Sequence, residues 1–237
     1  MLQINNINKA FGTTRVLQNI SLELPKGETL AVLGRSGCGK TTLLKIIAGL
    51  LPADAGEILQ NDQRQNELPP QRRNAVYLYQ EALLFPHLNV WENIAFGLRL
   101  RKTPENELKN RVEALLVHLG LQAEARRMPQ ALSGGQKQRV AFGRAIIIEP
   151  QVLLLDEPFG ALDPETRSQM QDFYQKTAEQ LQLSAVFVTH DLKEALRMGT
   201  RWAYLDQGQL QTYPTREAFV RDPKTGIEQE IEFWKNV

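Results

Sequence analysis

The sequence is poor in cysteine, in net charge and in long apolar runs. Its 237 residues include one cysteine, Cys38, so no disulfide can form within the chain, which is typical of a reducing compartment. Lysine and arginine number 28 against 27 aspartate and glutamate, and a net charge of +1 gives no general reason to expect binding to nucleic acid or to an anionic membrane. No apolar run reaches the ~18 residues of a membrane-spanning helix, and no signal peptide is predicted. These absences predict a soluble or peripheral protein.

The most informative stretch of the chain is glycine-rich. It fits the Walker A pattern G-x-x-x-x-G-K-[ST], and it follows an apolar run of strand type, residues 29–33, and precedes a run with helical spacing, residues 42–48. Its residues are Gly34, Arg35, Ser36, Gly37, Cys38, Gly39, Lys40, Thr41 and Thr42. This context predicts a loop that binds the phosphates of a nucleotide.

The residue types explain why such a loop binds phosphate. Glycines let backbone N–H groups approach an anion, and the helix that begins near Gly39 aims its free N–H groups at the same point. Lys40 can then reach the β- and γ-phosphates, and the Thr41 hydroxyl can ligate Mg²⁺. The alternative is a glycine-rich turn without a ligand. We interpret Cys38 as a small residue at a free position of the motif, with a redox sensor as the alternative.

Two further candidates lie on either side of this loop. Residues 1–27 predict short strands with a turn at 11–14, and Phe11 can either stack on a base or pack within a small sheet. Residues 74–79 predict a buried strand that ends at Gln80. Polar residues at such strand ends face the ligand crevice of open α/β sheets, so Gln80 is a candidate for contact with Mg²⁺ or with the attacking water.

Residues 81–131 predict a helical insertion in an α/β core. Helical spacing covers residues 90–98, and a second helix runs from Pro104 to a stop at Gly120. Phe85, Trp91 and Phe96 are expected in the core of this insertion, although an apolar loop of this kind leaves a partner site open.

A second anion site is predicted where Ser133 caps a helix whose first residues are glycines. Its residues are Ser133, Gly134, Gly135 and Gln136, and the alternative is a capped helix with a flexible start. Further on, four apolar residues predict a strand that ends at Asp156, where a carboxylate can hold Mg²⁺ through water. Glu157 points elsewhere and can orient or deprotonate the water that attacks the γ-phosphate. A solvated strand end is the alternative for this acidic pair.

The last predicted strand of the core, residues 185–189, ends at His190. A histidine in this place can donate a hydrogen bond to a γ-phosphate oxygen and so sense it, while a structural histidine is the alternative. Residues 202–210 predict a hairpin, and the segment after Pro214 predicts amphipathic helix.

The chain resembles the ATPase subunit of an ATP-binding-cassette (ABC) transporter from about Leu2 to Leu210. The matching motifs are Walker A at 34–42, the Q-loop at Gln80, the signature at 132–136, Walker B at 152–156, Glu157 after it, the D-loop at 161–163 and the switch histidine His190. The resemblance implies an α/β fold: a P-loop NTPase (RecA-like) core with an N-terminal antiparallel β subdomain and an inserted α-helical subdomain. Residues 1–82 and 150–237 are expected to form the core, and residues 83–149 the helical subdomain that carries the signature.

The resemblance also implies roles for single residues. Lys40, Thr41 and the loop amides would bind ATP phosphates and Mg²⁺, and Gln80 with Asp156 would complete the metal site. Phe11 stands where the family usually has tyrosine for adenine stacking. Tyr79, before the Q-loop glutamine, stands where phenylalanine is common.

Catalysis in this family requires two subunits. Glu157 would be the catalytic base and His190 the γ-phosphate sensor. The signature residues 133–136 would serve a second copy of the chain, because two ATPase domains close head to tail over two ATP molecules. Residues 81–97 would transmit closure to transmembrane permease subunits.

Within the family, the sequence resembles importers that use a solute-binding protein, above all the group that serves inorganic anions, ferric iron, polyamines, taurine or nitrate. The chain is expected at the cytoplasmic face of the cell membrane, without a nucleic-acid partner. Many members of that group carry a regulatory domain after the cassette; the sequence ends at Val237, so no regulation through such a domain is expected. The competing classes are a soluble ABC ATPase of translation or DNA maintenance and a P-loop kinase or GTPase, against which the signature counts.

Overall fold

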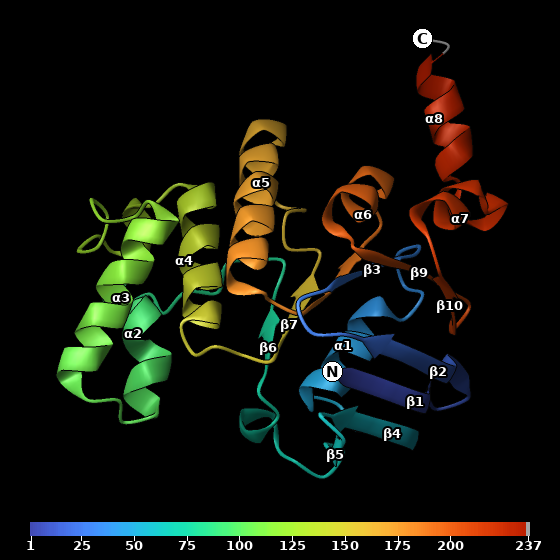
Figure 1. Ribbon diagram of the computed structural model, residues 1–237, viewed down its shortest axis with the longest axis horizontal. Coiled ribbons are helices and arrows are strands. Elements are labelled where there is room, and N and C mark those ends of the chain that lie inside the picture. Colours follow the sequence, from blue (N-terminus) through green and yellow to red (C-terminus); the bar gives the residue numbers. More distant parts are fainter. Residues whose placement is uncertain (236–237) are drawn as a thin grey trace. The chain divides into compact units, whose positions relative to one another are not determined.

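The computed structural model describes residues 1–235, which form two compact units (Figure 1). The first unit comprises Met1–Tyr77, Gln151–Glu157 and the chain from Gln175 onward, and the second comprises Leu78–Pro150 and Pro158–Tyr174. The expected division into a core of residues 1–82 and 150–237 and a helical subdomain of residues 83–149 stays a prediction. The compact helical unit begins earlier and also includes residues 158–174.

Two sheets form the framework of the first unit. The smaller one is antiparallel, in the order β2-β1-β4-β5, with β1 (Leu2–Phe11), β2 (Thr14–Leu24), β4 (Ala55–Gln60) and β5 (Gln63–Arg64). The larger one has the order β10-β9-β3-β8-β7-β6, with β3 (Thr29–Leu33), β6 (Ala75–Leu78), β7 (Val152–Asp156), β8 (Ala185–Thr189), β9 (Arg201–Asp206) and β10 (Gln209–Tyr213). Strand β3 pairs in parallel with β8 and β9, and β7 pairs in parallel with β8.

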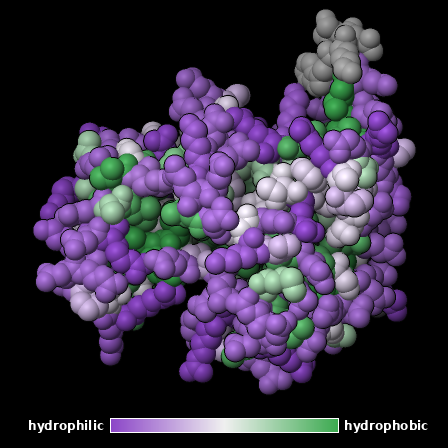
Figure 2. Space-filling view, viewed as in Figure 1, coloured by the Kyte–Doolittle hydropathy of each residue, from purple (hydrophilic) through white to green (hydrophobic). Residues whose placement is uncertain are grey.

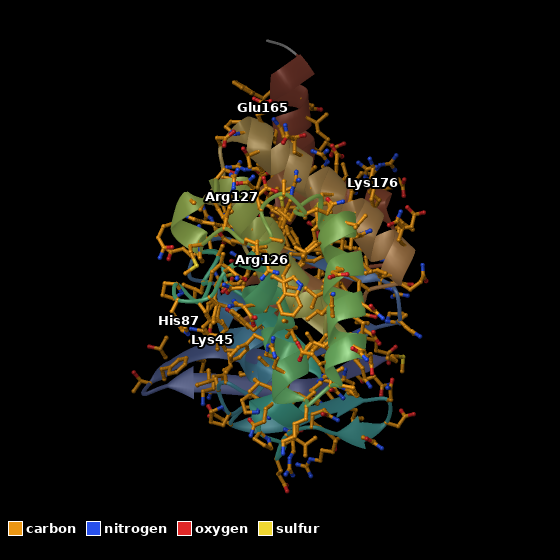
Figure 3. All side chains as sticks on the ribbon, turned by 90° about the vertical axis from the view of Figure 1, so that its left-hand side faces the viewer. Lys45, His87, Arg126, Arg127, Glu165 and Lys176 are labelled. Atoms are coloured by element: carbon orange, nitrogen blue, oxygen red, sulfur yellow. The ribbon has the colours of Figure 1, made fainter. Side chains whose placement is uncertain are left out.

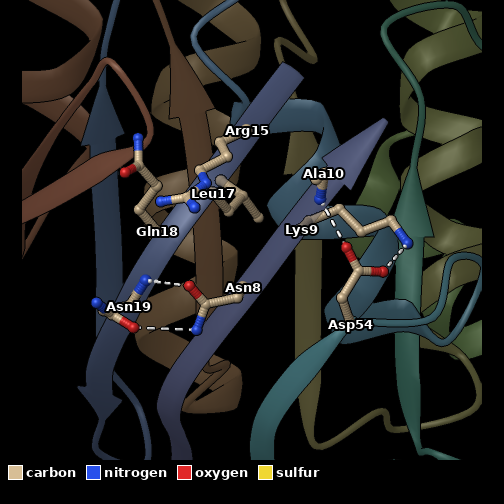
Figure 4. A pocket seen from close by; sticks show the side chains of 8 residues that line it. All are labelled: Asn8, Lys9, Ala10, Arg15, Leu17, Gln18, Asn19 and Asp54. Carbon is tan, nitrogen blue, oxygen red and sulfur yellow. Dashed lines mark hydrogen bonds and ion pairs between the residues drawn. The ribbon is translucent and has the colours of Figure 1, made fainter. Parts of the chain in front are cut away.

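The first two strands are longer than the sequence pattern predicts. Strands β1 and β2 each run without a break past positions where the apolar alternation fails, because irregularities in register absorb the extra residues. Asn6 and Asn19 adopt positive φ angles of 52° and 51°, a conformation that asparagine tolerates. The Asn8 and Asn19 side chains close one irregularity: Asn8 Nδ2 donates to Asn19 Oδ1, and Asn19 N donates to Asn8 Oδ1, both at 3.0 Å (Figure 4).

One apolar core joins both sheets to the first helix. All residues of β3 and β8 are buried, as their uninterrupted apolar runs predict for parallel strands covered on both faces. The cluster includes Ile4 and Ile20 of the small sheet, Leu43 of α1, and Leu154 and Val186 of the large sheet. Burial of this kind stabilises a fold by roughly 25 cal/mol per Å² of apolar surface.

The helices are divided between the units. Those of the first unit are α1 (Lys40–Ala48), α6 (Leu192–Met198), α7 (Arg216–Arg221) and α8 (Ile227–Lys235). Those of the second unit are α2 (Val90–Leu100), α3 (Glu105–Leu119) and α4 (Gly134–Ile146), while α5 (Pro164–Leu181) begins in the second unit and ends in the first. Within the described residues, none of these helices has the length and apolar character needed to cross a bilayer.

Close packing holds the second unit together. A Cβ atom at Gly143 in α4 would lie 2.4 Å from Leu119 Cδ1 in α3, so glycine lets these helices approach. Phe142 of α4 lies 5.6 Å, between ring centroids, from Tyr174 of α5, and Tyr174 also contacts Phe159. These rings explain why residues 158–174 cluster with the helical unit. The visible surface is mostly hydrophilic, with hydrophobic residues showing over this unit at the left of Figure 2.

A buried arginine closes the carboxyl end of α1. Arg73 is 5% exposed, and its guanidinium donates to the carbonyl oxygens of Ile46 (2.9 Å), Ile47 (3.3 Å), Leu68 (2.8 Å) and Asn66 (2.8 Å). A cation near the last carbonyl groups of a helix also complements the helix dipole. Burial lowers the pKa of the Arg73 guanidinium.

We expect Arg73→Ala to lower the free energy of unfolding by about 2–4 kcal/mol, because buried carbonyl groups lose their donors. Urea denaturation measures the change. Arg72→Ala, at the exposed neighbouring position, is the matched control and should change stability by less than about 0.5 kcal/mol. Equal stability of the two variants would contradict the role given to Arg73.

Candidate active site

The glycine-rich loop connects β3 to α1 as the motif predicts. Gly39 stands before the first turn of α1 with φ 111°, in a region that other residues rarely adopt, and it places no side-chain cap on the free N–H groups of the helix. A Cβ atom on Gly34 would lie 2.4 Å from the Leu205 carbonyl oxygen and 2.8 Å from Cys38 Sγ. The glycines therefore allow both the close packing of the loop and the exposure of its amides to an anion.

Lys40 lies at the bottom of this loop. The side chain is 5% exposed, and Nζ donates to the carbonyl oxygens of Gly34 at 2.7 Å and Arg35 at 3.1 Å. A pocket of about 310 Å³ opens beside it. The pocket is lined by Val16, Ser36, Gly37, Gly39, Lys40, Thr41, Thr42 and Glu157. An ammonium group and bare amides at one pocket suit the phosphates of a nucleotide.

Hard oxygen donors meet beside the pocket. Thr41 Oγ1 donates to Asp156 Oδ1 at 3.1 Å, and the Tyr77 hydroxyl donates to Asp156 Oδ2. Residues 1–235 contain no group of three or more His, Cys, Asp or Glu side chains that could hold a metal ion by themselves. One carboxylate with one hydroxyl nevertheless fits Mg²⁺, which keeps several waters and takes its other ligands from substrate phosphates. The donor set therefore fits the expected magnesium ion.

Glu157 lies between Lys40 and His190. Its Oε1 is 3.7 Å from Lys40 Nζ, and its Oε2 is 2.8 Å from His190 Nδ1. Glu157 has φ 45°, a left-handed conformation that costs a non-glycine residue of order 1–3 kcal/mol and is often found at functional sites. Its N–H donates to the Val188 carbonyl oxygen at 3.1 Å, which holds this turn against β8. The carboxylate is thus held next to a cation and to an imidazole.

A hydrogen-bonded network at Thr189, which the sequence motifs do not predict, supports the turn that carries His190. The buried Thr189 hydroxyl donates to Glu194 Oε2 at 2.9 Å and accepts from Asp191 N at 3.0 Å, while the Thr189 carbonyl oxygen accepts from Gly34 N at 3.3 Å. One residue therefore connects the histidine turn to α6 and to the first residue of the phosphate loop. The available signal was a polar residue, Thr189, at the end of an otherwise apolar strand.

Phe11 ends β1 with its ring 51% exposed, so the ring is accessible for stacking. Asp54 fixes the position of this strand end, because its carboxylate accepts hydrogen bonds from Ala10 N at 2.7 Å and from Lys9 Nζ at 2.6 Å (Figure 4). These bonds lower the pKa of Asp54, with the hydrogen bond from Lys9 as the largest cause. Lys9 Nζ also lies 5.5 Å from the centre of the Phe11 ring.

The signature residues lie in the second unit. Ser133 Oγ accepts from Gln136 N at 3.2 Å, and Gln136 Oε1 accepts from Ser133 N at 3.0 Å, a capping box that begins α4. The predicted cap is present, with Gly134 and Gly135 in the first turn. Gln80 belongs to the same unit, where its carbonyl oxygen accepts from Gln138 Nε2 at 2.9 Å. Its expected place beside Asp156 stays a prediction.

A buried asparagine shapes the loop at residues 85–89. Asn93 is fully buried; its Nδ2 donates to the carbonyl oxygens of Phe85, Leu88 and Asn89, and its Oδ1 accepts from Phe85 N. This network holds the loop in one conformation, with His87 exposed (Figure 3). Phe85 and Phe96 contact each other at 4.4 Å between ring centroids. Together with Trp91 they are only half-buried, so these rings do not lie in the buried core that the sequence predicts for the insertion.

The fold and the sequence identify the class of protein. Over 90% of this chain and 98% of the other, the structure matches the ATP-binding cassette MJ0796, solved as a dimer in a post-hydrolysis state bound to ADP and Pi, with a TM-score of 0.76 and 30% sequence identity. The family model described as "ABC transporter" matches residues 17–160. This chain belongs to the ABC transporter family. The predicted resemblance and the predicted fold class are confirmed.

Curated relatives include transport proteins. The spermidine/putrescine import ATP-binding protein PotA of Clostridium novyi is 42% identical over 227 residues, which cover 96% of this chain and 65% of that protein. The sulfate/thiosulfate import ATP-binding protein CysA of Synechocystis is 44% identical over 220 residues, which cover 93% of this chain and 62% of that protein. The chain thus spans less than two thirds of the length of these relatives.

The single cysteine allows a direct test of the phosphate loop. Burial raises the pKa of the Cys38 thiol above its usual value, and it outweighs the lowering effect of Lys40. Because the thiolate is the nucleophile, we expect slow alkylation by N-ethylmaleimide at pH 7, with a rate that rises about tenfold per pH unit toward the raised pKa. Saturating ATP should slow the reaction. A rate that stays constant from pH 7 to pH 8.5 would contradict this protonation state.

Proposed function

We propose that this chain binds and hydrolyses ATP and thereby powers the import of a solute through membrane permease subunits. The observation that carries the proposal is the position of Glu157, which lies 3.7 Å from Lys40 and 2.8 Å from His190 at the edge of the phosphate-loop pocket. A carboxylate in this place suits a general base that deprotonates the attacking water. His190 suits a sensor of the γ-phosphate, and the exposed Phe11 ring suits adenine stacking.

Magnesium would be held by Thr41 and Asp156, with Gln80 as a further ligand. When bound, the ion would neutralise charge on the phosphates. Lys40 would exchange its bonds to two loop carbonyl oxygens for bonds to phosphate oxygens, while Ser36, Gly37, Gly39 and the start of α1 supply amides.

We further propose that the working form is a homodimer. Two solved structures of MJ0796 are described as dimeric. The first turn of α4 presents N–H groups beyond the one that Ser133 caps, and the exposed Gly134 places no side chain over them. In the dimer, this turn would contact the ATP bound at the Walker A loop of the partner and complete the stabilisation of the transferred phosphoryl group.

Residues 81–97 are the proposed contact with the permease at the cytoplasmic face of the membrane. Asn93 preforms their loop, and Arg144 anchors it by donating to the Leu83 carbonyl oxygen at 2.6 Å and lying 4.9 Å from the Phe85 ring centre. The Leu83 side chain is 52% exposed. The names of PotA and CysA specify different solutes, so the similarity supports import without selecting the solute.

Glu157→Gln tests the proposed base. We expect turnover of ATP to fall by at least about 100-fold, because the amide cannot accept the proton of the attacking water. Binding of ATP should persist, and size-exclusion chromatography with ATP should show a stable dimer. Glu217→Gln, at an exposed position of α7, is the control and should hydrolyse ATP normally. Normal hydrolysis by Glu157→Gln would refute the assignment.

Affinity capture from detergent-solubilised membranes of the native host tests the transport role. We expect mass spectrometry to identify a multi-span permease with the tagged chain. Leu83→Glu should reduce this recovery, because a charge would enter the proposed contact. Leu181→Glu, at a similarly exposed leucine of α5 (49% against 52%), should not. Recovery of ribosomal or DNA-maintenance proteins without a membrane protein would support the soluble alternative instead.

A further inference from the structure

The Asp156 carboxylate is shared by hydroxyl groups from two other elements. Tyr77, in β6, donates to Asp156 Oδ2, and Thr41, in α1, donates to Asp156 Oδ1 at 3.1 Å. Strands β6 and β7 are neighbours in the larger sheet, so the bond from Tyr77 to Asp156 joins two adjacent strands. Tyr77 belongs to none of the sequence motifs that define the site.

We infer that Tyr77 is a positioning residue for the magnesium site, acting through Asp156. The inference rests on the proposed function, which places Mg²⁺ at Thr41 and Asp156. Tyr77 would act on the ion only through the carboxylate to which it donates. Its hydroxyl holds one carboxylate oxygen so that the other faces Thr41.

The physical basis is the freedom of an aspartate side chain. The terminal torsion of aspartate is broad, so a carboxylate held by one partner alone can turn its plane. A bond at Oδ2 from β6 and a bond at Oδ1 from α1 together define that plane. If the Thr41 hydroxyl turned to a bound metal ion, the bond from Tyr77 to Oδ2 would remain and would keep the carboxylate in its present orientation. Loss of such an outer partner typically weakens metal binding 10–100-fold.

The Tyr77 ring has a separate, structural role. It is half-buried and packs against the apolar core of the first unit. Tyr77→Phe therefore removes the hydroxyl and keeps the ring. A tyrosine hydroxyl that merely satisfies its own hydrogen-bonding need would leave magnesium binding unchanged when it is removed.

The test measures binding of a fluorescent, non-hydrolysable ATP analogue in EDTA and in saturating Mg²⁺. The dissociation constant in EDTA divided by that in Mg²⁺ expresses how strongly the ion stabilises the bound nucleotide. This ratio does not depend on turnover. We expect Tyr77→Phe to reduce this ratio by about tenfold, with the affinity in EDTA unchanged. Tyr213→Phe is the matched control, because it removes another tyrosine hydroxyl that donates to a carboxylate, Asp222 Oδ2 at 2.8 Å. It should keep the ratio of the unsubstituted protein.

A double-mutant cycle distinguishes action through Asp156 from independent action. In the Asp156→Asn background, Tyr77→Phe should change the ratio by less than about twofold, because the carboxylate that it positions is gone. An unchanged ratio in Tyr77→Phe alone overturns the inference. Equal loss of affinity in EDTA and in Mg²⁺ also overturns it, since Tyr77 would then support the nucleotide pocket as a whole. Absence of analogue binding by the unsubstituted protein overturns the proposed function and this inference together.

Discussion

The register of three parallel strands is the constraint on which the site depends. Leu33 pairs with Thr189, and Asp156 pairs with Val188, so β3, β8 and β7 end at the same edge of the sheet. The pairing continues past the strand ends: Gly34 N donates to the Thr189 carbonyl oxygen, and Glu157 N donates to the Val188 carbonyl oxygen. A shift of one residue in a single strand would turn its polar end to the opposite face. Apolar burial of the strands therefore also positions the phosphate loop, the two acids and the histidine.

Charge is arranged around this edge before any ligand is present. Lys40 is buried with two loop carbonyl oxygens as its partners, and Glu157 adds a negative group at 3.7 Å. The left-handed backbone of Glu157 is an unfavourable conformation that the ladder to β8 maintains. Such an arrangement suits the proposed hydrolysis of ATP, because charged groups that are already in place need less reorganisation when charge develops in a transition state. The Thr189 hydroxyl holds the turn at His190 in place through its hydrogen bonds with Glu194 and Asp191.

The motifs were predictable because each depends on local chemistry. Glycines with Lys40 and Thr41 need only a strand before them and a helix after them, and the capping box of Ser133 and Gln136 is closed within four residues. Other features depend on partners distant in the sequence. The sequence pattern predicted short strands where β1 and β2 are long. It could not show that pairing between the strands, including the contact of Asn8 with Asn19, absorbs the irregularities in register. Membership of residues 158–174 in the helical unit depends on aromatic contacts between α4 and α5.

The sequence by itself determined the parallel core, the phosphate loop, the capped signature helix and the acids at the end of β7, because apolar period, glycine placement and capping residues act over a few neighbouring positions. The tertiary structure alone decided which side chains support these motifs. Arg73 donates to carbonyl groups of α1 that are 26 and 27 residues away in the sequence, and Tyr77 donates to Asp156, which is 79 residues away. An arginine or a tyrosine in a sequence shows only that it can donate hydrogen bonds. The chain fold selects the acceptor, since burial of a donor is favourable only where an acceptor meets it.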